Sequence, residues 1–252
     1  MAAAAFFDLD RTLLRRSAAL ALAGAFRAQG LISRRQLVHA AAWQARYVCC
    51  GAGPEAVRRA AEDGPRVLAG VRPEELRSLV AASLEPVLRP LVYAEPLRLA
   101  AAHRARGERV YVISATLQEI AEAVAADLGF DGALGTVCEV RDGRYTGRAV
   151  RALHADAKAE SLRELAEREG FDLARCTAYS DSHTDLPLLE AVGRPVAVNP
   201  DRALRRVAAA RGWPVLEFRE PAHPPARRHV SPALAVAGIG AAAILARTSR
   251  GR

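Results

Sequence analysis

The sequence predicts an α/β fold: a Rossmann-like, doubly wound parallel sheet with a helical cap inserted after the first strand. From about residue 95 onward, short apolar runs alternate with helical segments, which is typical of a parallel sheet covered by helices. Another apolar run, residues 3–7, lies far upstream, and the pattern between the two regions is helical. The chain has 252 residues, 51% hydrophobic and 25% charged, which suits a globular protein and excludes a disordered chain or a coiled coil.

Residues 3–7 (A-A-A-F-F) are predicted to form a buried central strand, because a short apolar run that ends in carboxylates is typical of parallel sheets. A secretory signal would need a basic start and a longer apolar stretch, so none is expected. In the helical insertion, apolar spacing predicts helices over 18–28 and 36–47. Pro54 and Pro73 are predicted to open two more, since proline is favoured in the first turn of a helix.

The downstream part is predicted to alternate strands and helices. Gly107, Gly129 and Gly170 follow helical stretches and are expected to end them, because glycine adopts the left-handed conformation without steric cost. Asp142-Gly143 lies between two alternating runs and predicts a β-hairpin. The expected helices span 96–106, 117–128, 155–169, 185–191 and 202–211, and the expected strands span 109–113, 136–140, 145–150, 176–179, 195–198 and 215–218.

These patterns divide the chain into three regions: a core of 1–14 and 91–218, a helical cap of 15–90, and a tail of 219–252. The tail begins with a basic linker that contains prolines and then holds an apolar run, 233–246, with arginines on both sides. This run is shorter than the roughly 20 residues that a spanning helix needs. It is compatible with association with a membrane surface, and also with a helix packed on the protein or with no docked structure.

The net charge of +8 is concentrated outside the predicted core, since 15–90 carries +6 and 219–252 carries +5. The chain has no zinc-finger spacing and only 5% aromatic residues, so nucleic acid is not expected as a partner. A basic region beside an acidic core suits a small anionic substrate, although an arginine-rich surface alone would give the same balance. The four cysteines include no C-x-x-C pair, so reduced thiols and a cytoplasmic location are expected.

Two carboxylates, Asp8 and Asp10, follow the first predicted strand. Ligands of doubly wound sheets bind at the carboxyl ends of strands, so both side chains are placed for function. A D-x-D pair alone is explained as well by a loop pair or a helix cap. Together with Thr12 and the apolar flanks, however, residues 6–14 (F-F-D-L-D-R-T-L-L) resemble the D-x-D-x-T motif of the haloacid dehalogenase superfamily.

Three later segments match the pattern of that family in the same order. Residues 110–114 (V-Y-V-I-S) resemble its second motif, an apolar strand that ends in Ser or Thr. Lys158, at the start of a predicted helix, matches the lysine of the third motif, and it is the only lysine among 36 basic residues. Asp181 and Asp185 match the fourth motif, G-D-x-x-x-D, with Ser180 in place of the glycine. Residues 3–218 share the resemblance, and 129–198 is similar to the phosphoserine-phosphatase-like branch.

The resemblance implies an Mg²⁺-dependent phosphomonoesterase that works through an aspartyl-phosphate. Asp8 would be the nucleophile, and Asp10 would protonate the leaving oxygen and later accept a proton from water. The metal would be held by Asp8, the backbone carbonyl of Asp10, and Asp181, since Mg²⁺ takes one or two carboxylates plus other oxygens. Asp185 would orient a metal-bound water.

Thr12, Ser114 and Lys158 would, by the same resemblance, surround the phosphoryl oxygens, where developing charge needs donors. A compact ammonium at position 158 would fit beside a nucleophile where a guanidinium fork would not. Arg11 stands where relatives often carry a small residue. The rival hypothesis is a catalytically silent relative with a regulatory or binding role, but every proposed catalytic side chain is present.

The substrate is left open by the sequence. Phosphoserine phosphatases carry an acidic residue nine positions after the nucleophile, and here that residue is Ser17. The substrate is therefore expected to be a small phosphorylated metabolite, with phosphoserine and a lysophospholipid-type phosphate as alternatives. Asp10 disfavours a dehalogenase, and the lack of a second lysine disfavours a phosphonatase.

Overall fold

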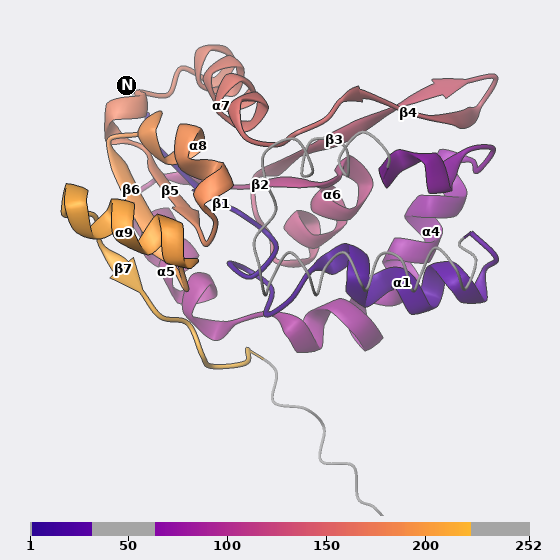
Figure 1. The fold of residues 1–252 in the computed structure, drawn as a ribbon, viewed down its shortest axis with the longest axis horizontal. Coiled ribbons are helices and arrows are strands. Elements are labelled where there is room, and N and C mark those ends of the chain that lie inside the picture. The colour runs from indigo at the N-terminus through magenta and orange to yellow at the C-terminus, as the bar shows by residue number, and fades with distance from the viewer. Residues whose placement is uncertain (1, 32–63, 223–252) are drawn as a thin grey trace, which may run out of the picture.

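The computed structural model describes residues 2–31 and 64–222. The helix predicted over 36–47, the helix predicted to open at Pro54, the apolar run 233–246 and two of the four cysteines lie outside the described residues. Within them, the predicted α/β architecture is confirmed: helices pack on a seven-stranded sheet with the order β4-β3-β2-β1-β5-β6-β7 (Figure 1).

The sheet is parallel except at one edge. Its strands are β1 (Ala4–Phe7), β2 (Arg109–Leu117), β3 (Gly132–Arg141), β4 (Arg144–Arg151), β5 (Thr177–Ser180), β6 (Arg194–Val198) and β7 (Val215–Leu216). The antiparallel pair is β3 with β4, joined by the predicted Asp142-Gly143 turn, in which both residues have positive φ. The first strand, β1, lies at the centre of the sheet, between β2 and β5.

The helices begin and end within two residues of the sequence-based predictions. They are α1 (Ala18–Ala28), α4 (Pro73–Ser83), α5 (Ala94–Ala105), α6 (Gln118–Asp127), α7 (Asp156–Glu169), α8 (Leu186–Glu190) and α9 (Arg202–Arg211). Single π-helical and 3-10 turns, Leu84–Leu88 and Arg89–Leu91, connect α4 to the segment before α5.

Three strands differ from the predictions by two or more residues at one end. Strand β3 begins at Gly132 instead of 136, because Gly132 already pairs with Tyr111 of β2. Strand β2 continues to Leu117 because, after a shift in register, Leu117 still pairs with Thr136 of β3. Strand β7 ends at Leu216, before the predicted residue 218, because the amide of Phe218 donates to the Asn199 side chain instead of to a neighbouring strand.

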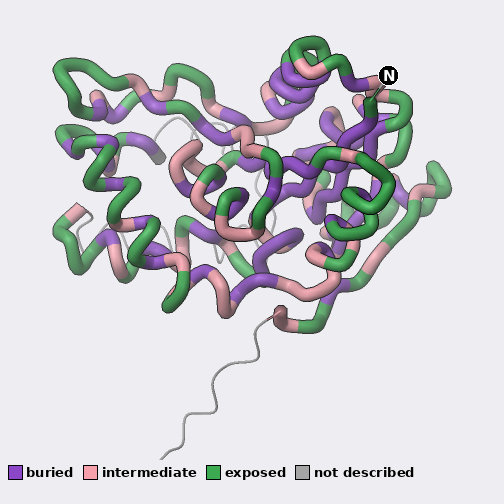
Figure 2. Tube along the Cα trace, turned by 180° about the vertical axis from the view of Figure 1, so that it is seen from behind, coloured by how far each residue is buried: buried purple, intermediate pink, exposed green. Residues whose placement is uncertain are grey.

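Strand β1 is buried on both faces, and this packing fixes the position of its carboxyl end, which Asp8 follows. Alternate side chains point to opposite sides of a strand, and here Phe6 and Phe7 enter separate hydrophobic clusters. Phe7 stacks on Tyr179 with ring centroids 4.3 Å apart, and Phe6 stacks on Tyr111 at 5.7 Å. Figure 2 shows this buried centre between exposed helices.

The segment that contains α1 and α4 leaves the sheet and returns to it at one place. The amide of Tyr93 donates to the carbonyl of Leu13 (3.0 Å), and the amide of Arg15 donates to that of Leu91 (2.8 Å). The two helices lie at the end of the molecule that carries the β3–β4 hairpin, away from α9 (Figure 1). Within residues 2–31 and 64–222, no helix is long and apolar enough to cross a membrane.

Candidate active site

Asp8 is the first residue after β1, and its backbone and side chain are both held. Its amide donates to the carbonyl of Tyr179 on β5 (2.9 Å), so the neighbouring strand fixes its position. The side chain is buried, with the residue 5% exposed. Burial raises the pKa of Asp8 to about 7, because the charge of Lys158 only partly offsets burial and the nearby carboxylates add to it.

Lys158 reaches into the same place from the first turn of α7. Its Nζ lies 2.7 Å from Oδ1 of Asp8 and 2.7 Å from Oδ2 of Asp185, so one ammonium bridges two carboxylates. Burial lowers the pKa of Lys158, but the two carboxylates outweigh burial and hold it above its ordinary value. Lys158 is therefore a cation buried beside the predicted nucleophile.

Asp181 and Asp185 come from the turn after β5. The hydroxyl of Ser182 accepts from the amide of Thr184 and starts a 3-10 turn that ends at Asp185. The Ser180 hydroxyl donates to Oδ2 of Asp185 (2.7 Å), a role for the serine that sequence reasoning missed. Burial raises the pKa of Asp181 well above its ordinary value, and the negative charge of Asp8 raises it further.

Asp10 is turned toward the start of α1. Its Oδ1 accepts from the amide of Ala18 (2.8 Å), and the Ser17 hydroxyl also donates to the carboxylate. Burial raises the pKa of Asp10, although these two hydrogen bonds oppose the shift. Ser17 makes no side-chain bond to cap the helix, so its hydroxyl serves Asp10 instead. The sequence analysis noted Ser17 only as the replacement for an acidic residue of phosphoserine phosphatases, so its contact with Asp10 was not predicted.

Thr12 and Ser114 are both buried at the same edge of the sheet. The pairing of Phe7 with Val112 brings the end of β2 alongside the loop that holds Asp8 and Thr12. Among residues 2–31 and 64–222, Thr12 Oγ1 is buried without a hydrogen-bond partner, and Ser114 Oγ accepts from the amide of Thr116 (3.2 Å). An unpaired buried hydroxyl costs free energy, so a ligand oxygen at this place would be favoured.

The donor set suits a hard divalent cation. Asp8 and Asp181 are both buried, and the charge of Asp8 raises the pKa of Asp181, so a cation between them would relieve their repulsion. The described residues contain no group of three His, Cys, Asp or Glu side chains that could hold a metal unaided. Magnesium needs no such cage, because it keeps several waters and binds through one or two carboxylates.

One predicted motif residue makes a contact that the sequence did not suggest. Arg11 was noted only for its size, yet its Nε lies 3.3 Å from Oδ2 of Asp181. His183 lies between the two acids of the fourth motif. Its backbone amide donates to the Asp201 side chain (2.9 Å). The spacing of a motif gives the order of residues along a loop, but not the direction of each side chain, so such contacts were beyond prediction.

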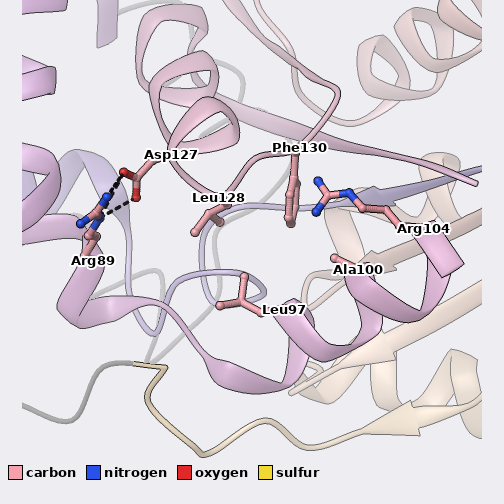
Figure 3. Close-up of a pocket in the computed structure, with 7 residues that line it drawn as sticks. All are labelled: Arg89, Leu97, Ala100, Arg104, Asp127, Leu128 and Phe130. Atoms are coloured by element: carbon pink, nitrogen blue, oxygen red, sulfur yellow. Dashed lines mark hydrogen bonds and ion pairs between the residues drawn. The ribbon is translucent and has the colours of Figure 1, made fainter.

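A hollow elsewhere on the surface contains none of the predicted site residues (Figure 3). It is lined by both apolar and charged side chains, and its two arginines are already engaged. Arg89 makes a forked ion pair with Asp127, and Arg104 lies over the Phe130 ring with its centroid at 5.4 Å. The chemistry therefore gathers at the carboxyl ends of β1 and β5, not in this hollow.

Comparison with known proteins identifies the family of the chain. The model of the haloacid dehalogenase-like hydrolases matches residues 5–190. A probable phosphatase of Mycobacterium tuberculosis is 44% identical over 218 residues, which cover 86% of this chain and 76% of that protein. A protein of the same organism named phosphoserine phosphatase is 39% identical over 246 residues, 96% of this chain and 79% of its own length.

A solved structure has a similar fold over most of the chain. A protein of unknown function from Bordetella pertussis superposes with a TM-score of 0.74 and 31% identity, covering 86% of this chain and 98% of that one. The family match spans the loops that carry Asp8, Lys158, Asp181 and Asp185. The chain therefore belongs to the haloacid dehalogenase-like hydrolase family.

Proposed function

We propose that this hydrolase is an Mg²⁺-dependent phosphomonoesterase that acts on a small phosphorylated metabolite through an aspartyl-phosphate on Asp8. One observation carries the proposal: the buried Nζ of Lys158 bridges Asp8 and Asp185 at 2.7 Å each, next to Asp181 and the unpaired hydroxyl of Thr12. A buried site with surplus carboxylates suits a divalent cation, and its donors suit phosphoryl oxygens.

In the first half of the reaction, a carboxylate oxygen of Asp8 attacks phosphorus and the bond from phosphorus to the leaving oxygen breaks. Asp10 donates its proton to that oxygen, and the raised pKa of Asp10 favours the protonated form at the start. In the second half, water attacks the phosphorus of the aspartyl-phosphate, Asp10 accepts the water proton, and inorganic phosphate leaves. The carboxylate of Asp8 is then restored.

The charge that develops on the transferring group is met by Lys158, Thr12 and Ser114, which we assign to its three non-bridging oxygens together. The metal would be held by Asp8, Asp181 and the carbonyl of Asp10, and when bound it supplies Lewis-acid neutralisation of the phosphate dianion. Asp185 holds Lys158 in place and would orient a water on the metal.

We propose two substrate classes for this site. The relative named phosphoserine phosphatase supports an amino-acid phosphate. Ser17, which occupies the place of the family's acidic residue and binds Asp10, favours a leaving group without an ammonium, such as a lysophospholipid-type phosphate. The kcat/KM values for phosphoserine and for a lysophospholipid-type phosphate, measured under the same conditions, show which class is preferred. Nucleic acid is not proposed as a partner.

We also propose the division into a core of 1–14 and 91–218, a cap of 15–90 and a tail of 219–252. The paired crossings at 13–15 and 91–93 support the first boundary, since the chain enters and leaves the cap region side by side. We further propose a cytoplasmic location, with the tail associating with a membrane surface. Co-sedimentation of the full chain and of a chain that ends at Ala222 with anionic vesicles tests the tail, and equal sedimentation would refute that part.

The mechanism is tested by Asp8→Asn. The amide is not a nucleophile and weakens the metal site, so turnover of an aryl phosphate should fall below detection while the far-UV spectrum and Tm stay close to the wild type. Asp142→Asn, in the exposed hairpin turn, is a matched control that should keep full activity. Activity that persists in EDTA, or in Asp8→Asn, would overturn the proposal.

A further inference from the structure

Arg11 has a backbone conformation that is unfavourable for a residue with a side chain. Its φ is +63°, in the left-handed region, between Asp10 and Thr12 of the first motif. Such a conformation costs of order 1 kcal/mol for a residue other than glycine, and a glycine would adopt it freely. A strained residue in the loop that carries the nucleophile suggests that its side chain has a function there.

The side chain of Arg11 extends to the predicted metal ligand. Its Nε lies 3.3 Å from Oδ2 of Asp181. The Asp181 side chain is 6% exposed and that of Arg11 is 35% exposed, so the guanidinium connects a buried carboxylate to the surface.

An ion pair of this kind has to break or loosen when a cation occupies the same carboxylate. Asp181 has two oxygens, and a guanidinium beside one of them repels a divalent cation held by the other. Metal binding would therefore release Arg11 from its partner. A partly exposed guanidinium freed next to Thr12, whose hydroxyl lacks a partner, is placed to meet an incoming phosphate.

We propose that Arg11 is an exchangeable counter-ion: it competes with the divalent cation for Asp181 and then binds the phosphate group of the substrate once the cation is in place. The inference rests on the proposed function and adds an order of binding to it, metal before substrate. It assigns the side chain at position 11 to phosphate binding, in addition to Thr12, Ser114 and Lys158.

The two halves of the proposal predict changes of opposite sign. Removing the guanidinium removes a competitor and a like charge, so Mg²⁺ should bind about tenfold more tightly to Arg11→Gln and Arg11→Gly. Inorganic phosphate, titrated at saturating Mg²⁺, should bind about tenfold more weakly to both. Arg11→Lys should lie between these variants and the wild type. A purely structural role would weaken both ligands together, since a disordered loop serves neither.

Isothermal titration calorimetry of Mg²⁺ on the metal-free protein, and of phosphate on the Mg²⁺-loaded protein, measures both effects without turnover. Arg11→Gln keeps the backbone strain, and Arg11→Gly removes it, so agreement between them assigns the effect to the charge. Asp142→Gly, which relieves a positive φ of 51° in the hairpin turn, controls for strain alone and should leave both affinities unchanged.

Unchanged Mg²⁺ affinity in Arg11→Gln and Arg11→Gly would overturn the competition for Asp181. Unchanged phosphate affinity in these variants would overturn the phosphate-binding role. These failures are distinct from failure of the proposed function. If the wild type binds Mg²⁺ and hydrolyses phosphomonoesters while the Arg11 variants bind both ligands normally, only the role of Arg11 is wrong. If the wild type binds no Mg²⁺ and hydrolyses no phosphomonoester, the proposed function is wrong.

Discussion

Two polar clusters, each with a buried centre, meet at Tyr179, and they differ in how their charges are balanced. The first, the α5 cluster, consists of His103, Arg106, Glu108 and the Tyr179 hydroxyl. The second, the Asp8 cluster, consists of Asp8, Asp181, Asp185, Lys158 and Arg11. Tyr179 connects the two clusters. Its hydroxyl lies 2.8 Å from His103 Nε2, and its backbone carbonyl accepts from the Asp8 amide.

In the α5 cluster every charge has its partner within the protein. Glu108 contacts His103 Nδ1 and lies 3.1 Å from Arg106. Burial raises the pKa of Glu108, but the hydrogen bonds from Arg106 and His103 outweigh burial and bring it below its ordinary value. The carboxylate is therefore stable as an anion without any ligand.

In the Asp8 cluster the acids outnumber the cations, and the pKa values of Asp8 and Asp181 are raised. His103 and Asp8 are both buried, so burial alone does not mark a functional site. The distinguishing property is the charge left over after internal pairing, because a proton or an external cation is needed to neutralise the surplus acid of the second cluster. The four predictions below test that distinction, from the largest expected effect to the smallest.

The largest effect is expected at Lys158. Lys158→Met removes the cation that bridges two carboxylates and the donor that we propose for the phosphoryl group, so kcat should fall about 10³-fold. Lys158→Arg restores the charge, but the buried space beside Asp8 suits a compact ammonium, so we expect it to recover little of the activity. Steady-state kinetics on an aryl phosphate measure both, and an Arg variant with half the wild-type kcat would contradict the size argument.

Asp10→Asn should lower kcat by about 10²-fold, because the amide neither gives nor takes the catalytic proton. Its predicted metal contact is the backbone carbonyl, so Mg²⁺ affinity should stay within about twofold. The loss in the phosphorylation step should be smallest for activated leaving groups, which need no proton. Single-turnover rates across a series of aryl phosphates measure this, and equal losses along the series would rule out a general acid.

His103→Gln should affect stability and leave chemistry alone, the reverse of the pattern at Lys158. The variant disturbs the bonds to Glu108 and Tyr179, and a buried group left without its partner costs about 1–3 kcal/mol. With the Asp8 cluster intact, kcat should stay within about twofold. Urea unfolding and kinetics on the same preparation test this, and a tenfold loss of kcat in a folded variant would mean that the two clusters are coupled through Tyr179.

The α5 cluster should also contribute to the pH dependence of stability. Burial lowers the pKa of His103 below 6.5, although Glu108 opposes the shift. The unfolded chain then takes up a proton at a higher pH than the folded protein, so stability from this group is present above about pH 6.5 and is lost as pH falls.

The free energy of unfolding should consequently drop less between pH 7.5 and 5.5 in His103→Gln than in the wild type. Both proteins share Asp8, whose raised pKa acts in the opposite direction, so its contribution cancels in the difference. Equal drops in the two proteins would show that His103 does not titrate differently on folding.

The sequence predicted the elements of the fold well, because each leaves a local signal. Apolar runs, helix-ending glycines and the Asp142-Gly143 turn gave helix ends within two residues and the correct hairpin. The extra length of β2 was not predicted, since it depends on pairing between Leu117 and Thr136 across a register shift. Such pairing is a property of the sheet and is absent from either segment taken alone.

Prediction of the site from the sequence was limited in the same way. The family motif named the residues, and the structure places Asp8, Lys158, Asp181 and Asp185 together. The contacts of Ser17, Ser180 and Arg11 depend on side-chain direction in tight turns, which spacing does not encode. Residues 32–63 of the proposed cap lie outside the described residues, so the helices predicted over 36–47 and from Pro54 stay predictions.

The central place of β1 has a consequence for how the protein is made. Its four apolar residues are synthesised before the rest of the sheet, yet they pair on one side with β2, from residue 109, and on the other with β5, from residue 177. At about 5–20 residues per second, the strand waits roughly ten to thirty seconds before its second partner is synthesised. The amide of Asp8, the proposed nucleophile, has no Tyr179 carbonyl to bind before then, so the site cannot be assembled until β5 has been synthesised.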